Sequence, residues 1–584
     1  MTAPVLDPTA VPDPLSILDQ IEADCDRLRT RNEGWKRAEP EIWMMRAIPG
    51  EIGLKPIGRL DYKAATKGTL PRKNNVVGTA VLNWRLDHWL ARELIKTPND
   101  PDVCKNIVLV VRFNGGRSQW SGLLHHWDVE TRRGVHYFST TWNCDMQFLA
   151  FMLGPPNPAL PLWLFQGPRV LPLFFPAKYA ISLLILMNLI RIMGHPWTLP
   201  DDPFDRDQYD SLVDWSDWQV RIKCNALPFD DSTLWTLLAT RMNTIDSVIA
   251  DALDDAQLTI VYRRVFPEWG DTVEGLIGGD DVASGTLVFE VVDRSGFYDP
   301  EGTLLTQNMF GGLVRSIAVY AEGSIEDTVS VFADDESIMP DEYWHEGFMG
   351  TFARRPAVTL WDSPWANFDS KVSWSPATAA SVVVGGDNPT ADAIAKLIIE
   401  TTGNLLGYFL LGGFDSLGDI ASGVIMPFIV GTILAWDEWK NIGRTKELGW
   451  VHLPEIYQRG AEQNAWSLTA AVVMRGGFTA TKSETSHQIS LPKTTWLIPG
   501  VHFDIGDRFA STQFAITTKA GVDIVFINRL EEMIPSWDHA AGQPFATELK
   551  IGQNKAAMSM GERSARLIKK ALQTMNDIGV HLIS

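Results

Sequence analysis

The chain has 584 residues, and its 71 Asp and Glu outnumber its 51 Lys and Arg, which gives a formal net charge of −20. Acidic residues spread along the whole chain exclude a protein that recognises nucleic-acid sequence, because phosphate binding needs clustered Lys and Arg, and they disfavour adhesion to anionic lipid. The length exceeds the roughly 250–300 residues at which a single core usually divides, so about three or four structural modules are expected.

The N-terminal region, residues 1–40, is expected to be an arm followed by a helix. Residues 1–13 are rich in proline and lack the basic and apolar regions of a secretory signal. Pro14 suits the first turn of a helix, and apolar residues then recur at three- and four-residue steps, which predicts one apolar stripe. The stripe consists of Leu18, Ile21, Cys25 and Leu28. It is expected either to dock on a neighbouring subunit or to pack on its own chain.

Residues 41–154 have the pattern of a first β-barrel or sandwich. The expected strands cover residues 41–45, 106–112, 119–130 and 135–141. The Asn114-Gly115 dipeptide between two of these apolar runs is a strong hairpin signal. Residues 82–94 read as a helix inserted between strands.

Residues 155–255 are predicted to form a strap and a helical domain. Residues 155–176 combine many prolines with aromatic residues, so we expect an extended, buried strap rather than a helix. Residues 177–193 are apolar on nearly every side, which predicts a helix enclosed by protein; they are short for a membrane span of ~20 residues. Residues 234–253 read as an amphipathic helix.

The second half of the chain adds three more predicted modules besides the apolar segment described below. Residues 256–390 are expected to be a mixed β domain, residues 466–530 a second β-barrel, and residues 531–584 a C-terminal helical tail with an amphipathic helix at 552–578. In the mixed domain the clearest strands are residues 258–265 and 286–293. The pattern predicts an α+β, multi-domain fold with β-barrel modules near both ends, joined by helical and mixed α/β insertions.

An apolar helical segment is predicted for residues 391–465. Between Gly403 and Trp436 its only ionised side chains are Asp415 and Asp419, and Pro427 and seven glycines interrupt it. It is too apolar for a surface loop and too broken for a span of ~20 apolar residues. Its own chain, identical copies or a membrane must therefore cover it. The candidate lumen-plug or membrane-contact residues are Leu405, Leu406, Phe409, Leu410, Phe414, Ile425, Phe428, Ile429, Ile433 and Trp436.

Known sequence motifs for catalysis, cofactor binding and metal binding do not assign a function to any residue. The sequence contains no phosphate-binding loop, no HExxH metal motif and no GxSxG nucleophile elbow. His125 and His126 are adjacent, so in a strand their rings are expected on opposite faces, which is poor geometry for one metal ion. The four cysteines have no metal-ligand spacing and are expected to be reduced and mostly buried. No catalytic, cofactor-binding or metal-binding residue is assigned.

Several short motifs occur in a characteristic order along the chain. They are Ile42-Trp43, Leu86-Asp87-His88, Trp120-Ser121-Gly122, Pro176-Ala177, Asn188-Leu189-Ile190-Arg191, Gly403-Asn404-Leu405-Leu406-Gly407, Leu434-Ala435-Trp436 and Asp504-Ile505-Gly506-Asp507-Arg508. In this order, over about residues 41–530, the chain resembles actinobacteriophage (mycobacteriophage) minor tail proteins of the siphovirus tail-hub or baseplate-hub family.

The resemblance implies a structural protein of the virion, made in the host cytoplasm. It implies a homotrimeric ring of β-barrels that closes the tail tube and acts in host attachment and genome delivery. The implied partners are the distal tail protein ring, the tape measure protein, and other minor tail, tip or fibre proteins. It brings no catalytic residue and no cofactor. In such a ring the apolar segment is expected to plug the lumen at the three-fold axis.

Two alternatives remain open at this stage. The 23 tryptophans and the acidic excess fit a tail-associated cell-wall glycan hydrolase, because tryptophan stacks on sugars and glycoside hydrolysis uses paired carboxylates. The apolar segment fits a membrane-active protein that inserts residues 405–414 and 420–436 into the host membrane.

Overall fold

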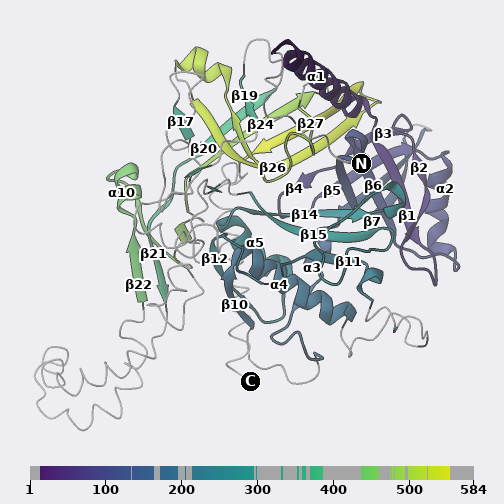
Figure 1. Ribbon diagram of the computed structural model, residues 1–584, viewed down its shortest axis with the longest axis horizontal. Helices are drawn as coiled ribbons and strands as arrows, with labels where there is room; N and C mark the ends of the chain where they lie inside the picture. The colour runs from purple at the N-terminus through teal and green to yellow at the C-terminus, as the bar shows by residue number, and fades with distance from the viewer. Residues whose placement is uncertain are drawn as a thin grey trace, which may run out of the picture.

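The architecture is known from a computed structural model (Figure 1). It describes residues 14–132, 135–162, 171–194, 204, 209, 214–225, 227–294, 297–298, 330–332, 352–353, 358–362, 369–385, 436–458, 474, 477–478, 481–492, 497–521 and 524–552. The apolar segment before Trp436 and the predicted helix at 552–578, apart from its first residue, lie outside the described residues.

The first β module is an antiparallel sheet in the strand order β2-β1-β6-β7-β8-β5-β3. Its strands are β1 (Glu41–Ala47), β2 (Leu54–Leu60), β3 (Ala65–Thr69), β5 (Thr79–Arg85), β6 (Ile107–Phe113), β7 (Ser118–Arg132) and β8 (Val135–Cys144). The predicted hairpin at Asn114-Gly115 is confirmed, since both residues have positive φ (52° and 64°) between the paired strands β6 and β7.

The predicted helix at 82–94 is half wrong. Its first part is the end of β5, where buried and exposed residues alternate and every residue pairs with β8. Helix α2 (Trp89–Lys96) begins only after His88, whose side chain caps the Leu90 N–H. In the sequence, the alternating apolar residues of β5 run directly into the apolar face of α2. Together they resemble the pattern of one helix.

One sheet continues from the first β module into the last, through pairing of β3 with β26 (Ile524–Asp538). From β26 it continues through β27 (Gln543–Ile551), β24 (Glu484–Pro492) and β20 (Ser370–Ser375). Trp537 of β26 covers Gly68 of β3, where an added Cβ would lie 2.3 Å from the indole. Trp537 also donates a 2.9 Å hydrogen bond to the Ala65 carbonyl. The two predicted barrels are thus parts of one sheet, which has 15 strands among the residues that the structure describes.

Other short strands extend the last β module. They are β4 (Arg72–Lys73), β17 (Ser330–Phe332) and β25 (Arg508–Ser511), which pair with β26, and β19 (Val358–Leu360), which pairs with β25. Because β26 and β27 reach Ile551, the predicted helical tail is wrong for residues 531–551. The module has its own core, which includes Phe509, Leu530 and Leu549.

The middle module packs helices α3 (Gln147–Ala150), α4 (Ala177–Leu189) and α5 (Ile245–Asp255) with three small sheets. The sheets pair β9 (Leu153–Gly154) with β13 (Asn243–Thr244), β10 (Leu171–Pro176) with β12 (Trp235–Thr240), and β11 (Val220–Lys223), β15 (Thr286–Asp293) and β14 (Leu258–Val265) in that order. The predicted strands 258–265 and 286–293 are confirmed. The predicted helix 234–253 is wrong in its first half, which is β12, whose alternate residues are buried against α4 and α5.

Helix α4 confirms the helix predicted at 177–193, and a π-helical turn extends it through Ile190–Gly194. Residues 177–194 form the one helix of the described residues that is long and apolar enough to cross a membrane. Its buried residues, among them Ile181, Leu184 and Leu189, belong to a core shared with the first β module. We therefore interpret α4 as a core helix.

A helix, a small sheet and a short ladder lie outside these modules. Helix α1 (Pro14–Arg37) lies along the top of the molecule in Figure 1. A small sheet of β22 (Trp436–Lys440), β21 (Ala379–Gly385) and β23 (Leu453–Tyr457), with α10 (Ile442–Leu448), lies on the opposite side from the first β module. A two-stranded ladder joins β16 (Phe297–Tyr298) to β18 (Phe352–Ala353). Strand-rich modules at both ends, with helices gathered between them, confirm the predicted α+β, multi-domain class.

Candidate assembly site

The small sheet holds side by side the two points of the chain that flank residues 386–435. These residues contain nine of the ten candidate plug residues. Strands β21 and β22 are antiparallel, and their last register pair is Gly385 with Trp436. The chain therefore leaves the sheet at Gly385 and returns to it directly opposite, at Trp436. Tyr457 of β23 closes this point, because its hydroxyl donates a 2.6 Å hydrogen bond to the Gly385 carbonyl. The Tyr457 ring also meets the Trp436 ring edge to face at 5.4 Å.

Gly385 is required at the centre of this arrangement. Its φ of 114° lies in a region that side-chain-bearing residues rarely adopt. β21 is the middle strand of the small sheet, between β22 and β23. We call Gly385, Trp436 and Tyr457 the clasp.

The other face of the small sheet is packed and makes the clasp rigid. Val382 and Val384 are fully buried against Met474 and Phe478. Arg444 of α10 is buried beneath them. Its guanidinium donates to the carbonyls of Ala379 and Phe478 and to the Thr481 hydroxyl, at 2.9–3.2 Å.

Exposed aromatic side chains gather on the same unit. Trp436 is 54% exposed, Tyr457 41%, and Trp450, between α10 and β23, 96%. Burial raises the pKa of Asp437, beside Trp436. Large exposed apolar side chains next to one another mark interaction surfaces.

The described part of the predicted helical segment 391–465 is mostly not helical. Residues 436–440 and 453–457 are strands, and only 442–448 are helix. Pairing with β21 overrides local propensity here. Of the ten candidate plug residues only Trp436 lies within the described residues, and the other nine stay a prediction.

A polar junction ties β4 and the residues after it to the last and middle modules. Arg72 of β4 and Asp504 form a two-pronged ion pair, at 2.7 and 3.2 Å, with the Arg72 side chain buried. Asn74 connects the last and middle modules: it donates to Glu531 of β26 and accepts from Thr259 of β14, each at 3.0 Å. Such charge-assisted, bidentate bonds fix the orientation of the elements that they join.

A second buried pair links the middle and first modules. Arg264 of β14 makes two 2.8 Å bonds to the carboxylate of Asp145, which is 2% exposed. Gln119 of β7 bonds both the backbone N–H and the carbonyl of Arg264. The first, middle and last modules therefore form one rigid frame.

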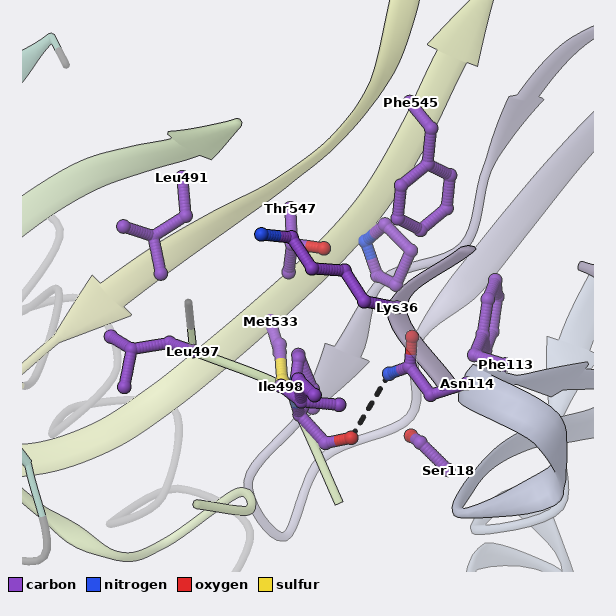
Figure 2. A pocket seen from close by; sticks show the side chains of 12 residues that line it. Lys36, Phe113, Asn114, Ser118, Leu491, Leu497, Ile498, Met533, Phe545 and Thr547 are labelled. Atoms are coloured by element: carbon purple, nitrogen blue, oxygen red, sulfur yellow. Dashed lines mark hydrogen bonds between the residues drawn. The ribbon is translucent and has the colours of Figure 1, made fainter. Parts of the chain in front are cut away.

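A narrow apolar groove opens where the first and last β modules meet at the end of α1 (Figure 2). Phe113, Met533 and Phe545 line it, and Asn114 donates a 3.0 Å bond to the Pro499 carbonyl across its floor. Its free volume is about 40 Å³. Small-molecule sites have roughly 300–1,000 Å³, so the groove does not suit a cofactor.

The histidine pair departs from its predicted geometry. The rings of His125 and His126 are 5.1 Å apart and in edge contact. The reason is a β-bulge, since the register with β8 shifts between Leu124 and His126, and a bulge puts consecutive side chains on one side. Both are exposed and His126 faces Asp128 at 3.4 Å. Within the described ranges no group of three or more His, Cys, Asp or Glu is placed to hold a metal.

A histidine–serine pair in the last module is buried. His487 of β24 shares a 2.6 Å hydrogen bond with Ser511 of β25, and both lie inside the module. Burial lowers the pKa of His487 to about 4. The pair is therefore enclosed by protein, without an opening to a large substrate.

The cysteines divide evenly between the interior and the surface. Cys144 and Cys224 are buried, Cys104 is partly exposed and Cys25 is exposed. All four are free thiols, so the expectation of mostly buried thiols holds for two of them.

Sequence comparison identifies the class to which this frame belongs. Residues 54–553 match the family described as Siphovirus ReqiPepy6 Gp37-like protein, and the chain belongs to that family. The predicted class, a minor tail protein located in the phage virion tail, is confirmed.

Individual relatives agree with the family. The chain is 27% identical over 381 residues to minor tail protein Gp28 of Mycobacterium phage L5, and 27% identical over 385 residues to minor tail protein Gp28 of Mycobacterium phage D29. These matches cover 62% of this chain and of the L5 protein, and 61% of this chain and of the D29 protein. The chain thus spans less than two thirds of either relative.

Solved structures with some likeness include a tail protein from Neisseria meningitidis and the 43 kDa tail protein of prophage MuSo2 from Shewanella oneidensis. Their TM-scores are 0.38 and 0.37, at 9% and 10% identity, and each alignment covers 88% of this chain and 97% of the other. The family assignment rests on the sequence matches alone.

Proposed function

We propose that the chain forms a homotrimeric hub at the tail tip, which closes the tail tube and acts in host attachment and genome delivery. Its proposed partners are the distal tail protein ring, the tape measure protein, and tip or fibre proteins. The family membership supports a tail role. The clasp is the observation that supports closure of the tail tube. It anchors the chain at Gly385 and Trp436, on both sides of residues 386–435, on a rigid unit.

Symmetry supplies the physical reason for closure. Apolar surface gains about 25 cal/mol for each Å² removed from water. Three copies around an axis cover one another's apolar segments, and closed cyclic symmetry is the usual arrangement of homo-oligomers. The proposed plug residues are those assigned from the sequence, from Leu405 to Trp436.

The clasp geometry permits a clean test. Because Gly385 and Trp436 are a register pair, an Asn-Gly turn can replace residues 386–435 without moving β21 or β22. Phage carrying this replacement should assemble tails but lose DNA from unattached particles. Infection and genome retention at wild-type levels would overturn the plug. The matched control is the substitution Trp374→Ala, on another exposed tryptophan.

A second candidate function is contact with the host membrane. The exposed Trp436, Trp450 and Tyr457 favour it, since Trp and Tyr concentrate at membrane–water interfaces. Release of dye from liposomes by the full chain, abolished by the Asn-Gly replacement, would support this candidate. Release that is unchanged by the replacement, or no release at any pH, would remove it.

We infer a structural rather than an enzymatic role. The relatives are named as minor tail proteins, and the buried His487–Ser511 pair has no access to a polymer substrate. Zymography on mycobacterial cell wall tests the glycan hydrolase alternative; cleared zones that a second, independently purified preparation reproduces would contradict our inference.

A further inference from the structure

Helix α1 carries an apolar stripe whose members Ile21, Cys25 and Leu28 the rest of the chain leaves exposed. Ile21 is 52% exposed and Leu28 46%, and Cys25 between them is also exposed. The sequence leaves two arrangements open, packing on the same chain or docking on a neighbouring subunit. The described part of the stripe does not pack on its own chain.

The helix is nevertheless firmly attached at its C-terminal end. Trp35 lies between the guanidinium groups of Arg31 and Arg117, 4.8 and 4.5 Å from the ring centre. It also packs on Gly115, where a Cβ would lie 3.2 Å from the indole. The attachment holds the C-terminal end of the helix against the turn between β6 and β7.

The stripe follows a heptad repeat. Successive steps of three, four, three, four and three residues connect its core positions. Position a holds Leu18, Cys25 and Asn32, and position d holds Ile21 and Leu28. The next d position, Trp35, packs on Gly115 of its own chain and marks the end of the free part of the stripe. A seam of this spacing is the signature of helices that wrap around one another. Leucine at a with isoleucine at d, as in the first heptad, favours more than two strands.

One pair of flanking charges fits a parallel pairing of identical helices. Asp24 occupies position g and Arg29 the following position e, and in a parallel coiled coil these two positions face each other between neighbouring helices. In the single chain Asp24 and Arg29 pair with Arg27 and Asp26, all exposed. Exposed pairs contribute little, so they can exchange for contacts between copies at small cost.

We propose that the α1 helices of neighbouring copies of this chain associate through this stripe as a parallel coiled coil. The inference deepens the proposed trimer, on which it rests, by naming one surface that joins the copies. A helix of this length, exposed on all sides along residues 20–31, gains little from its internal ion pairs. Covering Ile21, Cys25 and Leu28 supplies the missing stabilisation.

Cys25 provides the test, because a parallel in-register seam brings Cys25 of one copy next to Cys25 of another. Mild oxidation of the full-length chain should give covalent dimers on a non-reducing gel. The variant Cys25→Ser should give none. A matched control, Cys25→Ser with Thr30→Cys, moves the thiol to position f on the outer side of the coil and should cross-link at least tenfold less.

A second pair of variants measures the association itself. Leu28→Asp should shift dissociation, followed by native mass spectrometry, to at least tenfold higher protein concentration. Thr30→Asp adds the same charge outside the seam and should leave it unchanged. Since both positions are exposed in the single chain, both variants should keep the wild-type melting temperature of the body.

The outcomes separate this inference from the proposed hub. A trimeric mass without Cys25 cross-links, or with equal cross-linking from Thr30→Cys, overturns the coiled coil and leaves the trimer standing. A monomeric mass without cross-links overturns both. Cross-linking confined to Cys25, together with weakening by Leu28→Asp alone, supports the inference.

Discussion

Tyr457 and Gly385 are joined by a 2.6 Å hydrogen bond between the tyrosine hydroxyl and the glycine carbonyl, across 72 residues of sequence. The bond fixes the strand end from which the apolar segment departs, and Trp436 returns the chain opposite to it. The clasp thus gives the chain on both sides of residues 386–435 a fixed point of attachment on the small sheet.

The clasp should respond to two small substitutions. Tyr457→Phe removes the hydroxyl and should cost about 1 kcal/mol locally, so amide exchange should quicken in β21 and β22. Gly385→Ala forces a side chain into a φ of 114° and should cost ~1–3 kcal/mol. Hydrogen–deuterium exchange with mass spectrometry measures both. Tyr137→Phe, on an exposed tyrosine of β8, is the control; equal exchange in all three variants would refute the role of the clasp.

The Arg264–Asp145 pair should be essential to the frame. Arg264→Met leaves the Asp145 carboxylate buried and without its two 2.8 Å bonds, which should destabilise the chain by about 3–5 kcal/mol. Adding Asp145→Leu should restore much of the loss. Chemical denaturation gives these values. Arg85→Met removes the exposed pair with Asp87 and should leave the stability almost unchanged; similar losses from both arginines would count against the buried pair.

Acid should weaken the last module through His487. Its pKa is lowered to about 4 by burial, whereas an unfolded histidine titrates near ~6.5. The unfolded chain therefore binds an extra proton between these values. The corresponding stability is fully present above pH ~6.5 and is lost as the pH falls towards 4, by up to about 3 kcal/mol.

Melting temperatures between pH 7.5 and 4.5 check this prediction. The variant His487→Gln keeps a hydrogen-bonding group for Ser511 but cannot titrate, so its melting temperature should fall less steeply over this range. Parallel curves for the variant and the wild type would show that His487 does not contribute.

The continuous sheet should depend on the contact of Trp537 with Gly68. Trp537→Ala empties a buried site and should cost about 3–5 kcal/mol. Gly68→Ala places a methyl group 2.3 Å from the indole, so it should also destabilise. Calorimetry should detect both. Trp374→Ala, on a side chain that is 64% exposed, should have almost no effect, and a similar loss there would show that the measurement is not specific to β3 and β26.

Local patterns predicted much of this fold. Strands 258–265 and 286–293 are confirmed because each is a short apolar run, and the hairpin at Asn114-Gly115 is confirmed because only a few residue types accept positive φ. The pattern was misleading at 82–94 and 234–253, where a strand precedes a helix and both contribute apolar residues.

The features missed by the sequence are long-range. Pairing of β3 with β26 joins Lys67 to Asp538, and no local signal announces such a contact. The clasp depends likewise on residues of three different strands. The β-bulge beside His126 has no signal in the sequence pattern. The prediction that the two histidine rings lie on opposite faces was therefore wrong.

Electron cryomicroscopy of the tail tip on intact virions tests the central proposal most directly. We expect three copies around one axis, with residues 386–435 of each directed towards the axis and covered by the other two. A single copy, or three copies whose apolar segments are exposed to solvent or buried within their own subunits, would contradict the hub.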